Sequence, residues 1–147
     1  DEIPLRMMNL EDMRVLRLPK CAIASVPKVF FNLRRLQELN LEHNRITVVD
    51  KSIGQLEDLR SLALSGNGLT SLPVTTAFLT SLETVYLEDN KIEKVPHFRC
   101  SGVLQEVVLT GNRISRLPNN MFSLHMMLPF NAHVYKQKET PITVDNE

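Results

Sequence analysis

The sequence predicts an α/β solenoid: a horseshoe segment with a parallel concave sheet of about five strands and an irregular or 3₁₀ convex side. Three observations predict it. A pattern of eleven positions, with apolar residues at fixed places and an Asn near its end, recurs along the chain. The copies follow one another at an almost constant period, as they do in solenoid proteins. Within each copy apolar and polar positions alternate, which is typical of a strand with one buried face.

The repeated pattern is L-x-x-L-x-L-x-x-N-x-I, and Leu36–Ile46 fits it at every defined position. The other copies are Met13–Ile23, Leu59–Leu69, Leu82–Ile92 and Leu104–Ile114. Their first positions are residues 13, 36, 59, 82 and 104, so the period is 23 residues three times and then 22 residues. We therefore expect one strand per repeat, with the strands stacked in parallel.

Positions 4 and 6 of each copy are expected to point into the core. In the last four copies they are Leu39, Leu41, Leu62, Leu64, Val85, Leu87, Val107 and Leu109. Position 9 is expected to form a structural ladder along the stack: Cys21, Asn44, Asn67, Asn90 and Asn112. An Asn amide both donates and accepts, so it satisfies backbone groups of its own turn and of the adjacent repeat. Cys21 is a weaker, thiol version of the same part.

The return half of each repeat has an apolar residue, often followed by Pro, and further apolar residues four and seven positions on, as in Val26-Pro27, Phe30 and Leu33. Proline removes a donor and restricts φ, which favours short 3₁₀ pieces over long helices. The third return half has Thr76 at an apolar position, and we expect its neighbours Ala77, Phe78 and Leu79 to compensate. The fourth, Val95–Val103, is one residue short and predicts a local distortion.

These motifs resemble the leucine-rich repeat family from about Ile3 to Leu124. The 23-residue period with Leu-Pro-x-x-apolar-x-x-Leu is similar to the intracellular Ras-group and plant-intracellular repeats. The resemblance implies a curved scaffold that binds another protein on its concave sheet. Secreted members usually carry Cys-rich end caps. The chain has neither these caps nor an N-x-S/T glycosylation site, which favours a cytoplasmic location.

The pattern also predicts the domain organisation. Residues 1–126 form the solenoid, with a partial repeat at 1–12 whose strand is missing, so we expect an excerpt of a longer solenoid with an open strand edge. Residues 127–147 are a degenerate repeat or a C-terminal tail. A sixth strand is plausible around Phe130–Val134, whereas Lys136–Glu147 is polar and predicts a loop or frayed tail.

Composition and motifs argue against several functional classes. Lys and Arg number 17, as do Asp and Glu, so there is no basic footprint for nucleic acid. No apolar run approaches the roughly 18 residues of a membrane span. Motifs for a catalytic serine, a phosphate-binding loop or a metalloprotease helix do not occur. We therefore predict a protein that is not an enzyme, with no cofactor and no small-molecule substrate.

One spacing suggests a metal site. His97 and Cys100 stand three residues apart, and His125 and His133 are the only other nearby candidates. A structural zinc ion needs four ligands, and the segment with the second pair lacks a rigid pattern. We favour unremarkable surface residues over a metal site.

The concave face, defined by positions 3, 5, 7 and 8 of each copy, remains as the candidate binding surface. The first strand is basic and the later strands lean acidic. Tyr86 lies centrally on this face beside the small residues Ala63 and Ser65, with room for a partner side chain, and such Tyr residues are common interface anchors. The predicted partner-binding residues are Tyr86, Glu88, Asp89, Glu42, His43, Asn40, Glu38 and Arg17.

We expect the partner protein to present a basic surface to these residues. A second, basic stripe follows the ladder Asn and consists of Arg45, Lys91 and Arg113. We expect it to pair with Glu42 and Glu88.

The predicted function is a protein-protein interaction scaffold in signal transduction, and two alternatives to it stay open. One is a recognition or sensor arm of a larger kinase, ubiquitin ligase or immune receptor. The other is an inert structural spacer.

Overall fold

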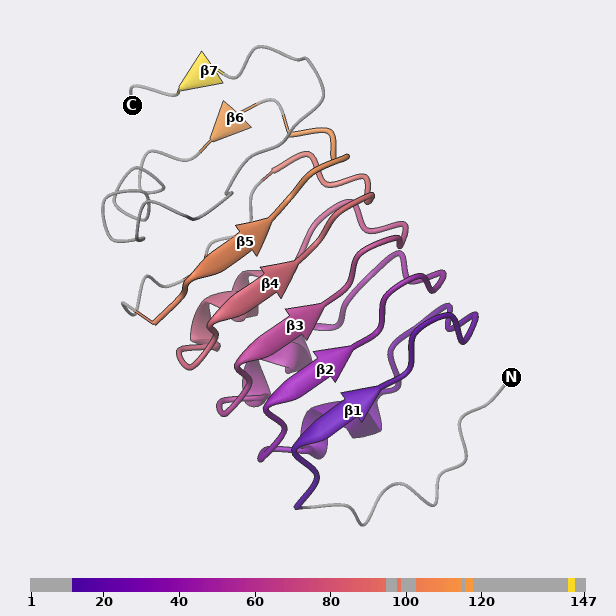
Figure 1. Cartoon of the computed structure of the whole chain (residues 1–147), viewed down its shortest axis with the longest axis vertical. Helices are drawn as coiled ribbons and strands as arrows, with labels where there is room; N and C mark the ends of the chain where they lie inside the picture. Colours follow the sequence, from indigo (N-terminus) through magenta and orange to yellow (C-terminus); the bar gives the residue numbers. More distant parts are fainter. Residues whose placement is uncertain (1–11, 95–97, 99–102, 115, 118–142, 145–147) are drawn as a thin grey trace.

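The predicted parallel sheet is present in the structure, a computed structural model that describes residues 12–94, 98, 103–114, 116–117 and 143–144. Five strands form it in the order in which they occur along the chain (Figure 1). They are β1 (Val15–Arg17), β2 (Glu38–Asn40), β3 (Ser61–Ala63), β4 (Thr84–Tyr86) and β5 (Glu106–Val108). Every pairing is parallel, so each repeat rises and returns in the same sense.

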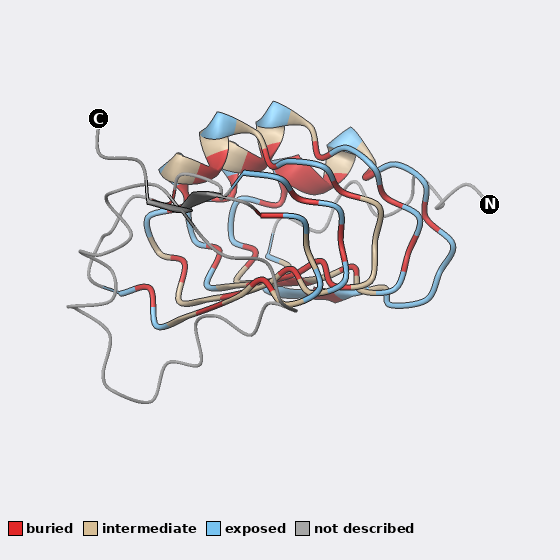
Figure 2. Cartoon of the chain, turned by 90° about the horizontal axis from the view of Figure 1, so that it is seen from above, coloured by how far each residue is buried: buried red, intermediate tan, exposed pale blue. Residues whose placement is uncertain are grey.

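The register of the sheet follows the repeat position for position. Leu16 pairs with Leu39, Leu39 with Leu62, and the same row continues through Val85 to Val107. This row and the row two residues later point into the core, as the alternation predicts, and all eight residues expected there are buried. Figure 2 shows the sheet on one side of the solenoid and the 3₁₀ helices on the other, with buried residues in both layers.

The convex side consists of short 3₁₀ helices, as the Val-Pro pattern predicts. They are η2 (Lys28–Asn32), η3 (Lys51–Gln55) and η4 (Val74–Phe78). Pro27 and Pro73 precede η2 and η4, and Asp50 takes this place before η3. The Asp50 carboxylate accepts hydrogen bonds from the Ser52 hydroxyl and backbone N–H, which lower the pKa of Asp50.

The third return half differs from the expectation. Thr76 itself occupies the core position, with 1% of its surface exposed, and its hydroxyl donates to the Pro73 carbonyl at 2.8 Å. That internal hydrogen bond makes burial of the hydroxyl tolerable. Phe78 does not compensate, because it is 57% exposed; only Leu79, a regular core position, is buried.

The C-terminal expectation is also wrong at one point. β7 (Thr143–Val144) pairs in parallel with β6 (Arg116–Leu117), although the sequence predicts a loop or tail there. Two consecutive β-branched residues have a high strand propensity, which the surrounding polar residues obscure. The partial repeat at 1–12, except Asp12, lies outside the described residues. So do most of the short fourth return half and the possible strand at Phe130–Val134.

The structural ladder joins each repeat to the one before it. The Asn90 side chain is typical: its amide donates to the carbonyls of Leu87 and Glu88 in its own turn and of Leu64 in the preceding repeat, at 3.0–3.1 Å. Its oxygen accepts from the Leu69 N–H at 3.0 Å. Asn44, Asn67 and Asn112 make the equivalent bonds.

Cys21 keeps one of these bonds, from its thiol to the Pro19 carbonyl at 3.4 Å, and its side chain is exposed. The thiol therefore substitutes for only a small part of what an Asn does at this position.

The ladder predicts unequal costs for two substitutions. Asn90→Ala should lower the free energy of unfolding by about 3 kcal/mol, because it leaves several buried backbone groups without a hydrogen-bond partner. Cys21→Ala should cost less than about 1 kcal/mol, because only one weak, exposed hydrogen bond is lost. Urea denaturation followed by circular dichroism measures both values. Equal costs would contradict the assigned role of Asn90.

Candidate functional site

The predicted partner-binding residues lie on two kinds of element. Arg17, Glu38, Asn40 and Tyr86 stand at the ends of β1, β2 and β4 and point away from the core, because their neighbours in the strands point inward. The other four lie in the turns directly after β2 and β4: Glu42, His43, Glu88 and Asp89. The sheet therefore brings all eight onto one face, spread over three of its five strands.

Position 8 is a left-handed backbone position in every repeat. His43 and Asp89 have φ values of 53° and 51°, and the equivalent Lys20 has 57°. The other two repeats have Gly66 and Gly111 there, with φ values of 67° and 76°. Sequence reasoning missed this role, although two glycines at one position of the repeat were its signal.

The glycines also make room for their neighbours. A Cβ atom on Gly66 would lie 2.3 Å from His43 Nδ1, and one on Gly111 would lie 2.3 Å from Asp89 Oδ1. The His43 and Asp89 side chains therefore lie over the turn of the next repeat.

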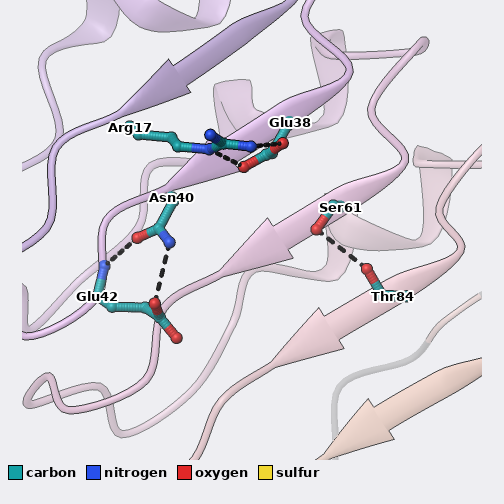
Figure 3. A network of polar contacts seen from close by, with 6 residues as sticks. All are labelled: Arg17, Glu38, Asn40, Glu42, Ser61 and Thr84. Atoms are coloured by element: carbon teal, nitrogen blue, oxygen red, sulfur yellow. Dashed lines mark hydrogen bonds and ion pairs between the residues drawn. The ribbon is translucent and has the colours of Figure 1, made fainter.

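Glu38 is the concave carboxylate that a cation neutralises. Arg17 Nη2 donates to Glu38 Oε2 at 2.8 Å, and Arg17 Nε donates to Glu38 Oε1 (Figure 3). The Arg17 hydrogen bonds lower the pKa of Glu38 against the opposing effect of burial. A bidentate pair of this kind is both strong and specific in geometry.

Three other concave carboxylates are held by neutral donors. Asn40 Nδ2 donates to Glu42 Oε2 at 2.9 Å (Figure 3), and the Ser65 hydroxyl donates to Glu88 Oε2. The Tyr86 hydroxyl donates to Glu106 Oε2 at 2.8 Å. Within the described residues, the second oxygen of each of these carboxylates accepts no side-chain hydrogen bond. They are therefore oriented, but their charge is not neutralised.

Glu106 thus joins the candidate site, although it was not among the predicted partner-binding residues. It occupies position 3 of β5, as Glu38 does on β2. The repeat register was therefore a signal that could have placed it.

The surroundings of Tyr86 correct the expectation of free space beside it. Ala63, its register partner on β3, and Ser65 are each only 7% exposed. Tyr86 itself is only partly exposed, and its hydroxyl is already engaged. Ala63 and Ser65 therefore offer little exposed surface beside Tyr86, whose hydroxyl donates to Glu106.

The expected pairing of the basic stripe is also wrong among the described residues. Arg45, Lys91 and Arg113 are exposed, and none of them forms an ion pair with another described residue. The reason is the orientation of their expected partners. Asn40 and Ser65 hold Glu42 and Glu88 on the concave face, whereas the stripe follows the ladder turn.

Charge on the concave face is distributed unevenly. In the first two repeats, two cations accompany two carboxylates: Arg17, Lys20, Glu38 and Glu42. The last two repeats have three carboxylates and no cation at these positions: Glu88, Asp89 and Glu106. The half of the face over β4 and β5 is therefore acidic.

The described residues offer little for other chemistry. Within the described ranges, no three His, Cys, Asp or Glu side chains lie close enough to hold a metal ion. His97, Cys100, His125 and His133 lie outside those ranges. In the described part of the chain, no helix is long and apolar enough to cross a membrane.

Comparison with known proteins agrees with the geometry of the repeats. A protein-family model described as leucine rich repeat matches residues 11–69 and 57–114. Together the two segments span more than half of the 147-residue chain. No curated protein matches the chain.

The bond between Tyr86 and Glu106 predicts a measurable titration. It raises the pKa of Tyr86 above its ordinary value of 10.0, since the ionised phenol would lose the bond and face a carboxylate. Stability from this bond is present below pH 10.0 and is lost as the pH rises through the raised pKa. Glu106→Gln should lower the Tyr86 pKa toward 10.0. NMR of the chain with ¹³Cζ-labelled tyrosine measures this, with Tyr86→Phe to assign the signal. An unchanged pKa in Glu106→Gln would contradict the assigned cause.

Proposed function

Because the chain belongs to the leucine-rich repeat family, we propose that its concave face binds a partner protein through a basic surface of that partner. Repeats of this family are generally protein-interaction modules, and they are typically not enzymes. The observation that supports a basic partner is the acidic half of the face over β4 and β5. Glu88, Asp89 and Glu106 lie there without a cation among the described residues of the face.

The geometry of these carboxylates suits recognition. Ser65 and Tyr86 hold two of them by single hydrogen bonds, so less side-chain freedom is lost when a partner binds. Each still has one oxygen free for a guanidinium or ammonium group. Complementary charge of this kind contributes mainly to specificity and to the rate of association.

The size of the sheet is also adequate. Five strands at about 4.8 Å spacing extend roughly 20 Å, which is comparable to a modest protein interface. We propose that this interaction occurs in the cytoplasm and that the module acts there as a scaffold in signal transduction; the resemblance of the repeats to the intracellular classes supports this proposal.

Charge reversal tests the proposal with a matched control. The variant Glu88→Lys, Asp89→Lys changes the acidic half of the face. The control Glu57→Lys, Asp58→Lys changes the net charge equally at exposed residues just before β3. Wild type, variant and control are used to capture proteins from the lysate of the native host, with quantitative mass spectrometry.

We expect a protein with a basic surface to be captured by wild type and control and to be reduced about tenfold by the variant, a loss typical of reversing contacts in an interface. Equal capture by all three would exclude the acidic half of the face as the binding surface. The binding surface would then lie on the convex side or on a flank, whereas capture of no protein by any of the three would favour the spacer alternative.

A further inference from the structure

Two equivalent contacts at opposite ends of the concave face differ in one respect. Each runs from position 5 of one strand to position 3 of the next strand, and we refer to such a contact as a diagonal. Arg17 of β1 reaches Glu38 of β2, and Tyr86 of β4 reaches Glu106 of β5. The register shows that both donors lean back by two residues: Arg17 pairs with Asn40, and Tyr86 pairs with Val108.

The two equivalent pairs of positions between them hold no carboxylate. They are occupied by Asn40 and Ser61 and by Ala63 and Thr84. Thr84 instead donates straight across to Ser61 at 3.0 Å (Figure 3). Charged diagonals are therefore confined to the two ends of the described sheet.

The chemistry of the donor decides what each charged diagonal leaves for a partner. The Arg17 guanidinium engages both oxygens of Glu38 and cancels its charge, so a second cation gains little there. The Tyr86 phenol engages one oxygen of Glu106 and leaves the charge in place. The same geometry thus leaves Glu38 neutralised at one end of the face and Glu106 charged at the other.

We propose that Arg17 and Tyr86 are specificity-determining residues, which direct a cationic side chain of the partner to the β4–β5 end of the concave face and away from the β1–β2 end. This inference rests on the proposed function, and it adds which residues of this chain direct the basic group of the partner to the acidic half of the face. Arg17 occupies both oxygens of Glu38, which a cation of the partner could otherwise bind. Tyr86 is a positioning residue that aims Glu106.

Glu88 and Asp89 reinforce the difference between the two ends. They follow β4 directly, and Ser65 of the preceding repeat holds the Glu88 carboxylate. A basic segment over β4 and β5 therefore meets three carboxylates. Over β1 and β2, a similar segment meets the cations Arg17 and Lys20 as well as Glu42.

Substitutions that exchange the two donors test the inference in the full chain. The probe is a fluorescein-labelled peptide in which Arg and Ala alternate, and a peptide in which Glu and Ala alternate is the control. Arg17→Gln frees the charge of Glu38, and Arg17→Lys keeps a cation as its matched control. Tyr86→Arg neutralises Glu106, and Tyr86→Gln removes the phenol without adding a charge. Circular dichroism confirms that each variant folds.

We expect Arg17→Gln to tighten binding of the cationic peptide about two- to fivefold and Tyr86→Arg to weaken it by a similar factor, the range for a partly exposed ion pair. Arg17→Lys should stay within about twofold of wild type, because it keeps the cation. Tyr86→Gln removes the phenol that aims Glu106 but adds no charge, so it should weaken binding less than Tyr86→Arg does. Fluorescence anisotropy at low ionic strength measures these constants, because salt screens exposed charges.

Backbone amide NMR locates the peptide. With wild type, the shifts should change most at β4, β5 and the turn with Glu88 and Asp89. In the double variant Arg17→Tyr, Tyr86→Arg they should move toward β1 and β2.

Two results would contradict different statements. If wild type prefers the cationic peptide but the substitutions at Arg17 and Tyr86 change neither its affinity nor its location, the inference is wrong and the proposed function stands. If wild type binds the acidic peptide as tightly as the cationic one, the proposed basic partner is wrong and the inference fails with it.

Discussion

The amide of each ladder asparagine binds backbone groups of two repeats at once, and the geometry of the whole stack depends on these bonds. Asn44 illustrates it: its oxygen accepts from the N–H groups of Cys21 and Ile23, while its amide donates to Leu18 and Leu41. One side chain thus satisfies buried and half-buried backbone groups that strand pairing leaves without a partner. Because the same bonds recur in each repeat, the strands keep a constant register, and the outward side chains form regular rows.

Regular rows have a consequence for charge. Each position of one strand faces a fixed position of the next strand. The residue type at the first position therefore determines whether a carboxylate at the second is neutralised. The contacts of Glu38 and Glu106 show this, since they occupy the same row but have an arginine and a tyrosine as donors. The concave face is thereby divided into a balanced part and an acidic part, although the chain as a whole has no net charge.

The convex side obeys looser constraints. Its 3₁₀ helices fully bury only one or two side chains each, such as Phe30 and Phe31 of η2, and their remaining residues are half-buried or exposed. This freedom explains how Asp50 takes the place of a proline before η3, with its carboxylate binding Ser52. It also explains how Thr76 enters the core with its own internal hydrogen bond, while the larger Phe78 beside it stays outside.

The sequence by itself determined the repeat, the parallel sheet, its register and its inward rows. These depend on the period of the repeat and on the alternation of apolar and polar residues, which recur in every copy. Residues such as Leu39 and Leu62 could be placed without coordinates for that reason. Only the tertiary structure decided which donor holds which carboxylate. Three of those contacts join residues 20 to 23 positions apart and depend on how each side chain leans across the sheet. The predictions of free space beside Tyr86 and of ion pairs with Arg45 and Lys91 were wrong because both depended on the direction of side chains. The direction of a side chain depends on the neighbours against which it packs, and the repeat pattern of the sequence does not describe those neighbours.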